Sequence, residues 1–173
     1  METGARWYVI QVQTGREEQI IEEAGKYQVQ EYFEEIFTPR IEKKKKYLGE
    51  LNLETVLLFP VYLVVISSSP EELYQALKRV PQLTKLLGTG EKWTPMTEED
   101  IAVVETLSGT EHLMKFSEGY IQGDSVRVMS GPLKGLEGKI SRIDRHKRLA
   151  WLKVELFGRT VELQAGLEIV RKE

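Results

Sequence analysis

Cysteine is absent from the 173-residue chain, and histidine occurs only twice. The first absence excludes disulfides, thiolate metal sites and cysteine nucleophiles. His112 and His146 each stand alone, without a second histidine at ligand spacing, so we predict no metal site and no cofactor. The carboxylates are scattered without a paired acid and base, and the glycines near Gly131 match no phosphate-loop pattern. The sequence therefore predicts no catalytic residue and no enzyme.

The chain also lacks an apolar run long enough to cross a bilayer. The longest, from Val56 to Ile66, is short and contains Pro60, so a strand buried on both faces explains it better. No apolar leader precedes Trp7. The composition, 41% hydrophobic and 29% charged, is that of a folded chain. We therefore expect a cytoplasmic protein that has no membrane partner.

The net charge of −3 conceals an uneven distribution along the chain. Residues 119–173 contain 11 Lys and Arg against 7 Asp and Glu, whereas the preceding residues contain 13 against 20. An acidic first part and a basic second part indicate that the two parts meet different partners. A basic excess of this size is also common in surface loops, so the charge alone does not choose a partner.

Strands and helices are expected to alternate over the first half of the chain. Arg6–Val12 is rich in aromatic and β-branched residues and predicts a strand. Thr14 and Glu17 have capping-box spacing before an amphipathic helix. Ser69 and Pro70 form a strong start for a second helix. Between the helices we expect a short strand at 35–39, a polar loop at 40–50 and the apolar strand ending at Ile66. This order is typical of a small α+β sandwich.

The second half is expected to end in a barrel. A brief strand is expected at 84–89, a third helix after Thr97, and a polar linker at 108–122. The pattern then changes to short strands with period-two alternation, separated by turn-rich segments. The five expected strands are DSVRVMSG, EGKISRID, RLAWLKVEL, RTVEL and LEIVRKE. They predict a small closed β-barrel, since closure removes exposed strand edges.

Six segments, in matching order and spacing, resemble the NusG family of bacterial transcription elongation factors. WYVIQVQTG resembles the family's opening strand, FTPRIEKKKK its β-hairpin arm, and LFPVYLVV its F-P-G-Y-V-L-V core strand. VPQLTKLLGTGEKWTPMTEED resembles the segment that leads to a P-x-P-L-x-x-E-E helix start. GDSVRVMSGPLKGLEGKISRID resembles the KOW motif, and FGRTVEL the hairpin after it. The resemblance implies an NGN-type α/β sandwich with an antiparallel sheet over 1–107, a linker over 108–122, and a five-stranded SH3-like KOW barrel over 123–173.

The same resemblance implies that the first domain binds RNA polymerase. In the family this domain grips the clamp helices of the polymerase's largest subunit and holds the clamp closed over DNA. The family's hydrophobic clamp-facing surface corresponds here to Tyr8, Phe59, Pro60 and Tyr62. Aromatic residues on strands more commonly belong to the core, so core and interface are both open alternatives at these positions.

A run of lysines lies in the segment that resembles the family's arm. Lys43, Lys44 and Lys45 belong to it, and a charge run is ordinarily a solvated loop. In the family the arm lies on the DNA side, where consecutive lysines would neutralise phosphates without reading the sequence. Contact with non-template DNA therefore stays open beside the solvated loop.

Two positions in the first domain depart from the family pattern. Val61 stands where F-P-G-Y has its glycine, and a branched side chain there alters the local packing or the clamp surface. Residues 78–82 replace the family's R-N-T-P-G, whose Asn-Thr pair reads the non-template strand. The second departure puts sequence-specific pausing in doubt.

The turn between the second and third KOW strands is acidic or mixed in the family but strongly basic here. Its cationic side chains and their basic neighbours are Arg145, His146, Lys147, Arg148, Lys139, Arg142 and Lys153. The planar fork of arginine suits phosphates and guanine edges, and structured RNA is recognised through backbone, shape and exposed bases. RNA contact and a plain solvated turn are the alternatives. The first resembles LoaP, the RNA-dependent antiterminator branch of the family.

The FGRTVEL hairpin carries a different implication. In housekeeping members of the family it binds a small-subunit ribosomal protein or the Rho terminator. Phe157, Arg159 and Val161 preserve much of that pattern. Phe157 could instead cap the barrel, so coupling to translation stays open.

These patterns lead to one hypothesis and two alternatives. We expect a monomeric processive antitermination factor that binds the polymerase clamp through its first domain and a nascent leader RNA hairpin through its KOW domain. The alternative is a housekeeping elongation factor whose KOW domain couples polymerase to the ribosome or Rho. A ribosome-associated KOW protein with an unrelated first domain is disfavoured by the N-terminal motifs.

Overall fold

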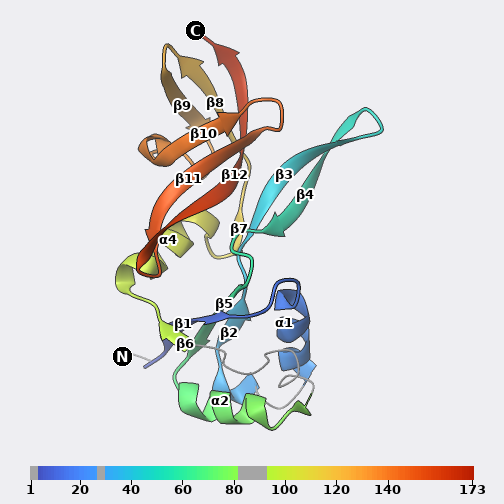
Figure 1. The fold of residues 1–173 in the computed structure, drawn as a ribbon, viewed down its shortest axis with the longest axis vertical. Helices are drawn as coiled ribbons and strands as arrows, with labels where there is room; N and C mark the ends of the chain where they lie inside the picture. Colours follow the sequence, from blue (N-terminus) through green and yellow to red (C-terminus); the bar gives the residue numbers. More distant parts are fainter. Residues whose placement is uncertain (1–3, 27–29, 82–92) are drawn as a thin grey trace. The chain divides into compact units, whose positions relative to one another are not determined.

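The computed structural model describes residues 4–26, 30–81 and 93–173 (Figure 1). The chain divides into two compact units, and each is interrupted in sequence by part of the other. The first comprises Met1–Thr38 and Phe59–Thr97, and the second comprises Pro39–Leu58 and Glu98–Glu173. The strand expected at 84–89 lies outside the described residues. None of the helices within the described ranges is long and apolar enough to cross a membrane.

The first unit is built on a four-stranded antiparallel sheet. Its strands are β1 (Arg6–Gln11), β2 (Glu35–Phe37), β5 (Tyr62–Ser67) and β6 (Trp93–Pro95), in the order β2-β5-β1-β6. Its helices within the described residues are α1 (Glu17–Lys26) and α2 (Pro70–Lys78), with a 3-10 turn η1 (Gln30–Tyr32) before β2. Ile10 and Val65 from the sheet pack in one cluster with Ile20 of α1 and Leu73 of α2. Both helices therefore bury their apolar sides against this sheet.

The N-terminus of α1 differs from the expected capping box. The carboxylate of Glu17 accepts hydrogen bonds from the backbone N–H groups of Gly15, at 3.0 Å, and Val61, at 2.8 Å. The Glu17 side chain is buried, and the two N–H donors satisfy it. Glu17 therefore ties the start of α1 to the turn that precedes β5.

That turn places Val61 in a strained conformation. Val61 has a φ of 74°, and a β-branched residue at positive φ is a genuine outlier. Glycine adopts this conformation without steric cost, whereas other residues lose roughly 1–2 kcal/mol. The apolar strand expected from Val56 to Ile66 is interrupted at this point, because the chain turns between Leu57 and Tyr62.

We expect Val61→Gly to raise the free energy of unfolding by about 1 kcal/mol, since relief of strain outweighs the added flexibility of the unfolded chain. Urea denaturation measures the change. Val56→Gly is the matched control, because Val56 lies in strand β4 and its replacement is expected to destabilise. An equal loss of stability in both variants would contradict the strain at Val61.

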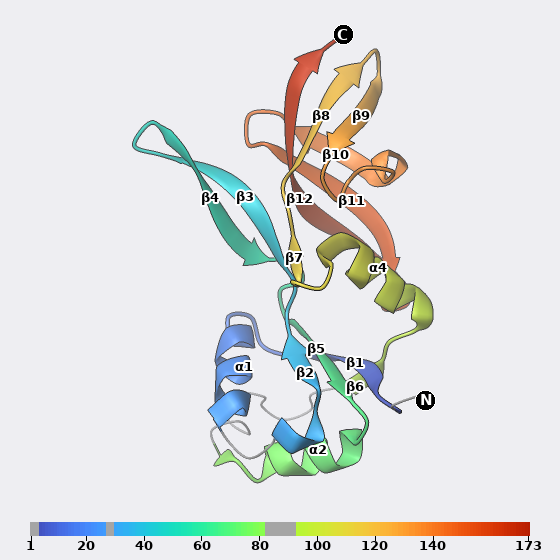
Figure 2. The same ribbon diagram turned by 180° about the vertical axis from the view of Figure 1, so that it is seen from behind.

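The second unit holds a β-hairpin, a helix and a five-stranded sheet (Figure 2). The hairpin strands β3 (Arg40–Tyr47) and β4 (Glu50–Leu57) are called the arm below, and β7 (Leu113–Met114) pairs with β3 in parallel. The helix is α4 (Glu98–Ser108). The five-stranded sheet contains β8 (Ser117–Gln122), β9 (Ser125–Ser130), β10 (Ile140–Asp144), β11 (Leu149–Leu156) and β12 (Arg159–Lys172), with a 3-10 turn η2 (Glu137–Lys139). Its order is β10-β11-β12-β8-β9.

The predicted α+β class, with an antiparallel N-terminal sheet and a five-stranded C-terminal domain, is confirmed. Besides the interrupted apolar strand, three local predictions were wrong. The polar loop at 40–50 is most of the arm. RTVEL and LEIVRKE form one continuous strand, β12. The fifth strand of the barrel is β8, which lies in the second half of the expected linker at 108–122.

Candidate nucleic-acid interface

A basic cavity of about 510 Å³ lies between the arm and the turn that joins β10 to β11. Both views show this turn on the same side of the five-stranded sheet as the arm (Figure 1). We call it the basic cavity. Its charged and polar lining is formed by lysines 43–46, Glu54, His146, Lys147, Arg148 and Gln164, beside the ring of Trp151. The lysine run and the basic turn, about a hundred residues apart in sequence, therefore meet at one site.

The arm is held in shape by a tight turn. Leu48 and Gly49 connect the strands with φ of 51° and 84°, as a two-residue hairpin turn with matching twist requires. Strand β3 carries four consecutive lysines, and the pairing places Lys44 opposite Leu53 and Lys45 opposite Asn52. Both faces of this part of the arm therefore carry positive charge, which explains why the segment resembled a loop in sequence.

The turn between β10 and β11 is also ordered by its own side chains. The Asp144 carboxylate accepts the backbone N–H of Lys147 at 2.9 Å. Arg148 has a φ of 57°, and its guanidinium donates to the carbonyl of His146 at 3.3 Å. These bonds fix the loop backbone and leave the Lys147 side chain at the cavity.

Glu168 on β12 joins the two halves of the cavity. Lys44 Nζ of the arm donates to Glu168 Oε2 at 2.7 Å, and Arg148 Nε of the turn lies 3.8 Å from Glu168 Oε1. Lys44 also lies over the ring of Phe116, 4.3 Å from its centroid. The hydrogen bond from Lys44 is the main reason that the pKa of Glu168 falls below its ordinary value, with the charges of Lys44 and Arg148 adding to it and partial burial opposing it.

Protonation of Glu168 in acid is expected to weaken its interaction with Lys44 and so the attachment of the arm. A group whose pKa is lowered on folding stabilises fully above its unfolded pKa, near 4.5, and loses that contribution as the pH falls through the lowered folded value. We expect Glu168→Gln to reduce stability at neutral pH and the difference from the wild type to vanish in strong acid. Urea denaturation across a pH series measures it. A difference that does not change between neutral and strongly acidic pH would contradict the assignment.

Four of the expected nucleic-acid contacts lie outside the cavity lining. Arg142 stacks on Trp151, with its guanidinium carbon 3.8 Å from the ring centroid, and so flanks the cavity indirectly. Lys139, Arg145 and Lys153 are not among the lining residues. Lys46, Trp151, Gln164 and Glu168 were not predicted as site residues. The lysine run itself gave a signal for Lys46, but the other three are recognisable only once β11 and β12 are paired.

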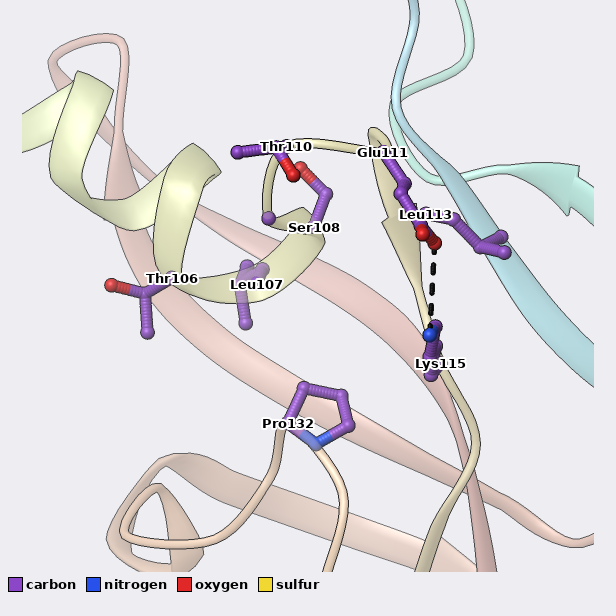
Figure 3. A pocket seen from close by; sticks show the side chains of 9 residues that line it. Thr106, Leu107, Ser108, Thr110, Glu111, Leu113, Lys115 and Pro132 are labelled. Carbon is purple, nitrogen blue, oxygen red and sulfur yellow. Dashed lines mark ion pairs between the residues drawn. The ribbon is translucent and has the colours of Figure 1, made fainter.

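A second cavity, of about 360 Å³, lies at the C-terminal end of α4 (Figure 3). Its lining includes Thr106, Ser108, Thr110 and Pro132, and an ion pair of 3.6 Å joins Glu111 to Lys115 at its edge. The lining lacks a concentration of one charge. Across the described ranges, no group of three or more His, Asp or Glu side chains could hold a metal ion. The basic cavity is therefore the stronger candidate for a binding site.

Comparison with known proteins decides the family. The family model described as "Transcription termination factor nusG" matches residues 5–105, which is more than half of the chain. The chain belongs to the NusG family. A KOW motif model matches residues 122–157. The chain is therefore a transcription termination/antitermination factor of that family, with an NGN domain followed by a KOW domain.

The similarity to individual relatives is low in identity but extends over nearly the whole chain. The NusG protein of Helicobacter pylori is 27% identical over 173 residues, which cover 96% of this chain and 97% of the relative. That of Pasteurella multocida is 24% identical over 176 residues, covering 98% and 96%. A solved structure concerned with domain interaction in Thermotoga maritima NusG has a TM-score of 0.54 at 22% identity and covers 94% of this chain and 93% of its own. This last likeness bears on the fold alone.

The four expected polymerase contacts of this NusG-family chain differ in exposure. Pro60 is exposed, and Tyr8 and Tyr62 are half-buried. Phe59 is 4% exposed, so its ring lies in the interior in this arrangement. Tyr8 also lies against Trp93, with ring centroids 6.2 Å apart. Three of the four positions therefore present at least part of their surface to a partner.

The hairpin between β11 and β12 contacts α4. Phe157 and Gly158 form its turn with φ of 57° and 77°. The backbone N–H of Phe157 donates to Oδ1 of Asp100 at 3.0 Å, and Asp100 is a buried residue of α4. Phe157 and Val161 are half-buried, whereas Arg159 is exposed. The motif expected to bind a protein partner is therefore partly engaged within its own unit.

Proposed function

We propose that this NusG-family chain is a processive antiterminator of the LoaP type. Its N-terminal domain binds the RNA polymerase clamp, and its KOW domain binds a structured leader RNA. The observation that carries the proposal is the turn between β10 and β11, whose His146, Lys147 and Arg148 line a cavity together with four lysines of the arm. Phosphates are the natural counterions for such a concentration of positive charge.

Polymerase binding is proposed from the family resemblance and from the exposed surface around Pro60 and Tyr62. The factor would act as a clip and not as a catalyst. If it binds the closed clamp better than the open one, it shifts an existing equilibrium by no more than that difference in affinity. Antitermination follows, since a closed clamp disfavours the paused state that precedes release.

The test is transcription through an intrinsic terminator with purified polymerase, on templates with and without a hairpin-forming leader upstream of the terminator. We expect added protein to increase read-through only where the leader is transcribed. Lys147→Ala should reduce this increase. Lys172→Ala, which removes a basic side chain elsewhere on the barrel, should not. Read-through that is independent of the leader would overturn the proposal.

The housekeeping alternative is favoured by the β11–β12 hairpin, where the Phe157–Gly158 turn is formed and Arg159 is exposed. In that case the KOW domain would bind a small-subunit ribosomal protein or Rho. A pull-down with each purified partner distinguishes the two functions. Binding that is lost in Arg159→Ala and unaffected by Lys147→Ala would favour this alternative.

A further inference from the structure

The basic cavity has an excess of positive charge that the protein itself does not neutralise. Six Lys and Arg side chains line it, and Glu54 is the one carboxylate among the lining residues that the structure describes. Lys44 and Arg148 are paired with Glu168. Lys45, Lys46 and Lys147 form no ion pair with any residue in the described ranges. Their charges are therefore available to an anionic ligand.

The size of the cavity restricts that ligand. A volume of about 510 Å³ lies within the range of about 300–1,000 Å³ that is typical of small-molecule sites. A cavity of this size holds a nucleotide or two, not a paired stem. Paired RNA also hides its major-groove base edges in a deep and narrow groove, whereas unpaired nucleotides offer the whole base as well as the phosphate.

The remaining lining residues suit an unpaired nucleotide. Trp151 is half-buried and lies directly opposite Gln164 in the pairing of β11 with β12. Arg142 lies over one face of the indole ring. The other face is left for a base, and an indole stacks with any base. The exposed Gln164 amide can both donate and accept hydrogen bonds, so it can contact a base edge or the 2′-hydroxyl that distinguishes RNA from DNA.

We propose that the basic cavity is a composite site for an unpaired stretch of RNA, held between the arm and the barrel. This inference rests on the proposed RNA-binding function and specifies its ligand as a loop or bulge. The turn residues Lys147 and Arg148 hold the backbone from one side, and Lys45 and Lys46 of the arm hold it from the other. Trp151 and Gln164 receive the base and ribose. The arm, which belongs to the region matched by the NusG model, is thereby part of the RNA site.

The test is fluorescence-anisotropy titration of the full chain with three labelled probes, namely an oligouridylate, a blunt RNA duplex and an oligothymidylate, over a series of salt concentrations. We expect the oligouridylate to bind most tightly. In the double variant Lys45→Ala/Lys46→Ala, the association constant should fall less steeply with salt concentration. The magnitude of the slope of log K against log salt should decrease by about 1.4, because each phosphate contact to a single strand contributes about 0.7. This corresponds to an association constant about 25-fold lower at 0.1 M salt, relative to the effect of the same variant at 1 M. Gln164→Ala should reduce the preference for oligouridylate over oligothymidylate.

Lys172→Ala is the matched control, since Lys172 is an exposed lysine of β12 that does not line the cavity, and it should leave the slope unchanged. An unchanged slope in the arm double variant, with binding weakened by Lys147→Ala, would overturn the composite site and leave RNA binding by the barrel in place. Tighter binding of the duplex would overturn the unpaired ligand, and equal affinity for oligothymidylate would overturn the assignment to RNA. Absence of binding to any probe would overturn the inference, while leader-dependent read-through separately decides the proposed function.

Discussion

Gly131→Ala is expected to lower the free energy of unfolding by about 2–5 kcal/mol, because it combines backbone strain with a steric clash. Gly131 follows β9 with a φ of 98°. A Cβ at this position would lie 2.6 Å from Cα of Ser117 and 2.8 Å from the carbonyl oxygen of Phe116. Ser117 cannot withdraw easily, since it is fully buried and its hydroxyl accepts the backbone N–H of Leu133 at 3.2 Å.

Gly135→Ala is the control that separates the two causes. Gly135 also has a positive φ, 86°, but a Cβ there would meet nothing within 4 Å. We expect this variant to lose only the strain contribution, about 1–2 kcal/mol. Denaturation in urea, followed by tryptophan fluorescence and circular dichroism, measures both variants. Equal losses would show that the contact with Ser117 is relieved by a small shift of the backbone.

Gly166→Ala is expected to weaken the attachment of the arm to the barrel. Gly166 lies in β12, and a Cβ there would lie 2.6 Å from the carbonyl oxygen of Glu42 in the arm and still closer to the Phe116 ring. The same Phe116 donates its backbone N–H to the Glu42 carboxylate at 2.9 Å. The methyl group must displace either the arm or the ring, at a cost of about 1–3 kcal/mol. We expect reduced stability together with the RNA-binding loss seen in the arm double variant.

Gly138→Ala is the matched control for this change. Gly138 has no contact within 4 Å of a built Cβ and lies in the 3-10 turn η2 without a positive φ. We expect it to be neutral or to stabilise by up to about 1 kcal/mol, because alanine restricts the unfolded chain. Hydrogen exchange in β3 and β12 provides the second readout. Unchanged protection in the Gly166 variant, with full RNA binding, would contradict the role of this glycine in docking the arm.

The helices and the general class of the fold could be predicted because their signals are local. Ser69 and Pro70 start α2 as expected, although the Ser69 side chain makes no capping bond. The arm was missed by residue patterns because its polar strands lie largely in solvent and show no alternation. Strand β8 was missed because Ser117 and Gly119 resemble linker residues, yet both are buried. For the arm, the resemblance to the NusG family indicated a hairpin that the periodicity of the residues did not.

The candidate site was predicted in pieces. The lysine run and the basic turn were each recognised, but nothing in the sequence shows that residues so far apart line one cavity. Their meeting depends on the pairing of β11 with β12 and on the contact of β3 with β12, which are non-local. Glu168 could not be predicted as a site residue, because its role depends on ion pairs with Lys44 and Arg148, which are distant in sequence. Which macromolecule each expected contact residue meets stays a prediction.

The interrupted order of the second unit has a consequence for biosynthesis. The arm, within Pro39–Leu58, leaves the ribosome well before β12, the strand against which it packs. The first part of the segment between them, Phe59–Thr97, belongs to the other unit. Chains emerge at about 5–20 residues per second, so the arm waits on the order of several seconds for its partner. Tyr47, Leu48 and Leu53 of the arm are exposed even in the folded protein, so they are also exposed throughout this interval. The four adjacent lysines then keep like-charged nascent chains apart, which adds a second use for the same charges that line the cavity in the finished protein.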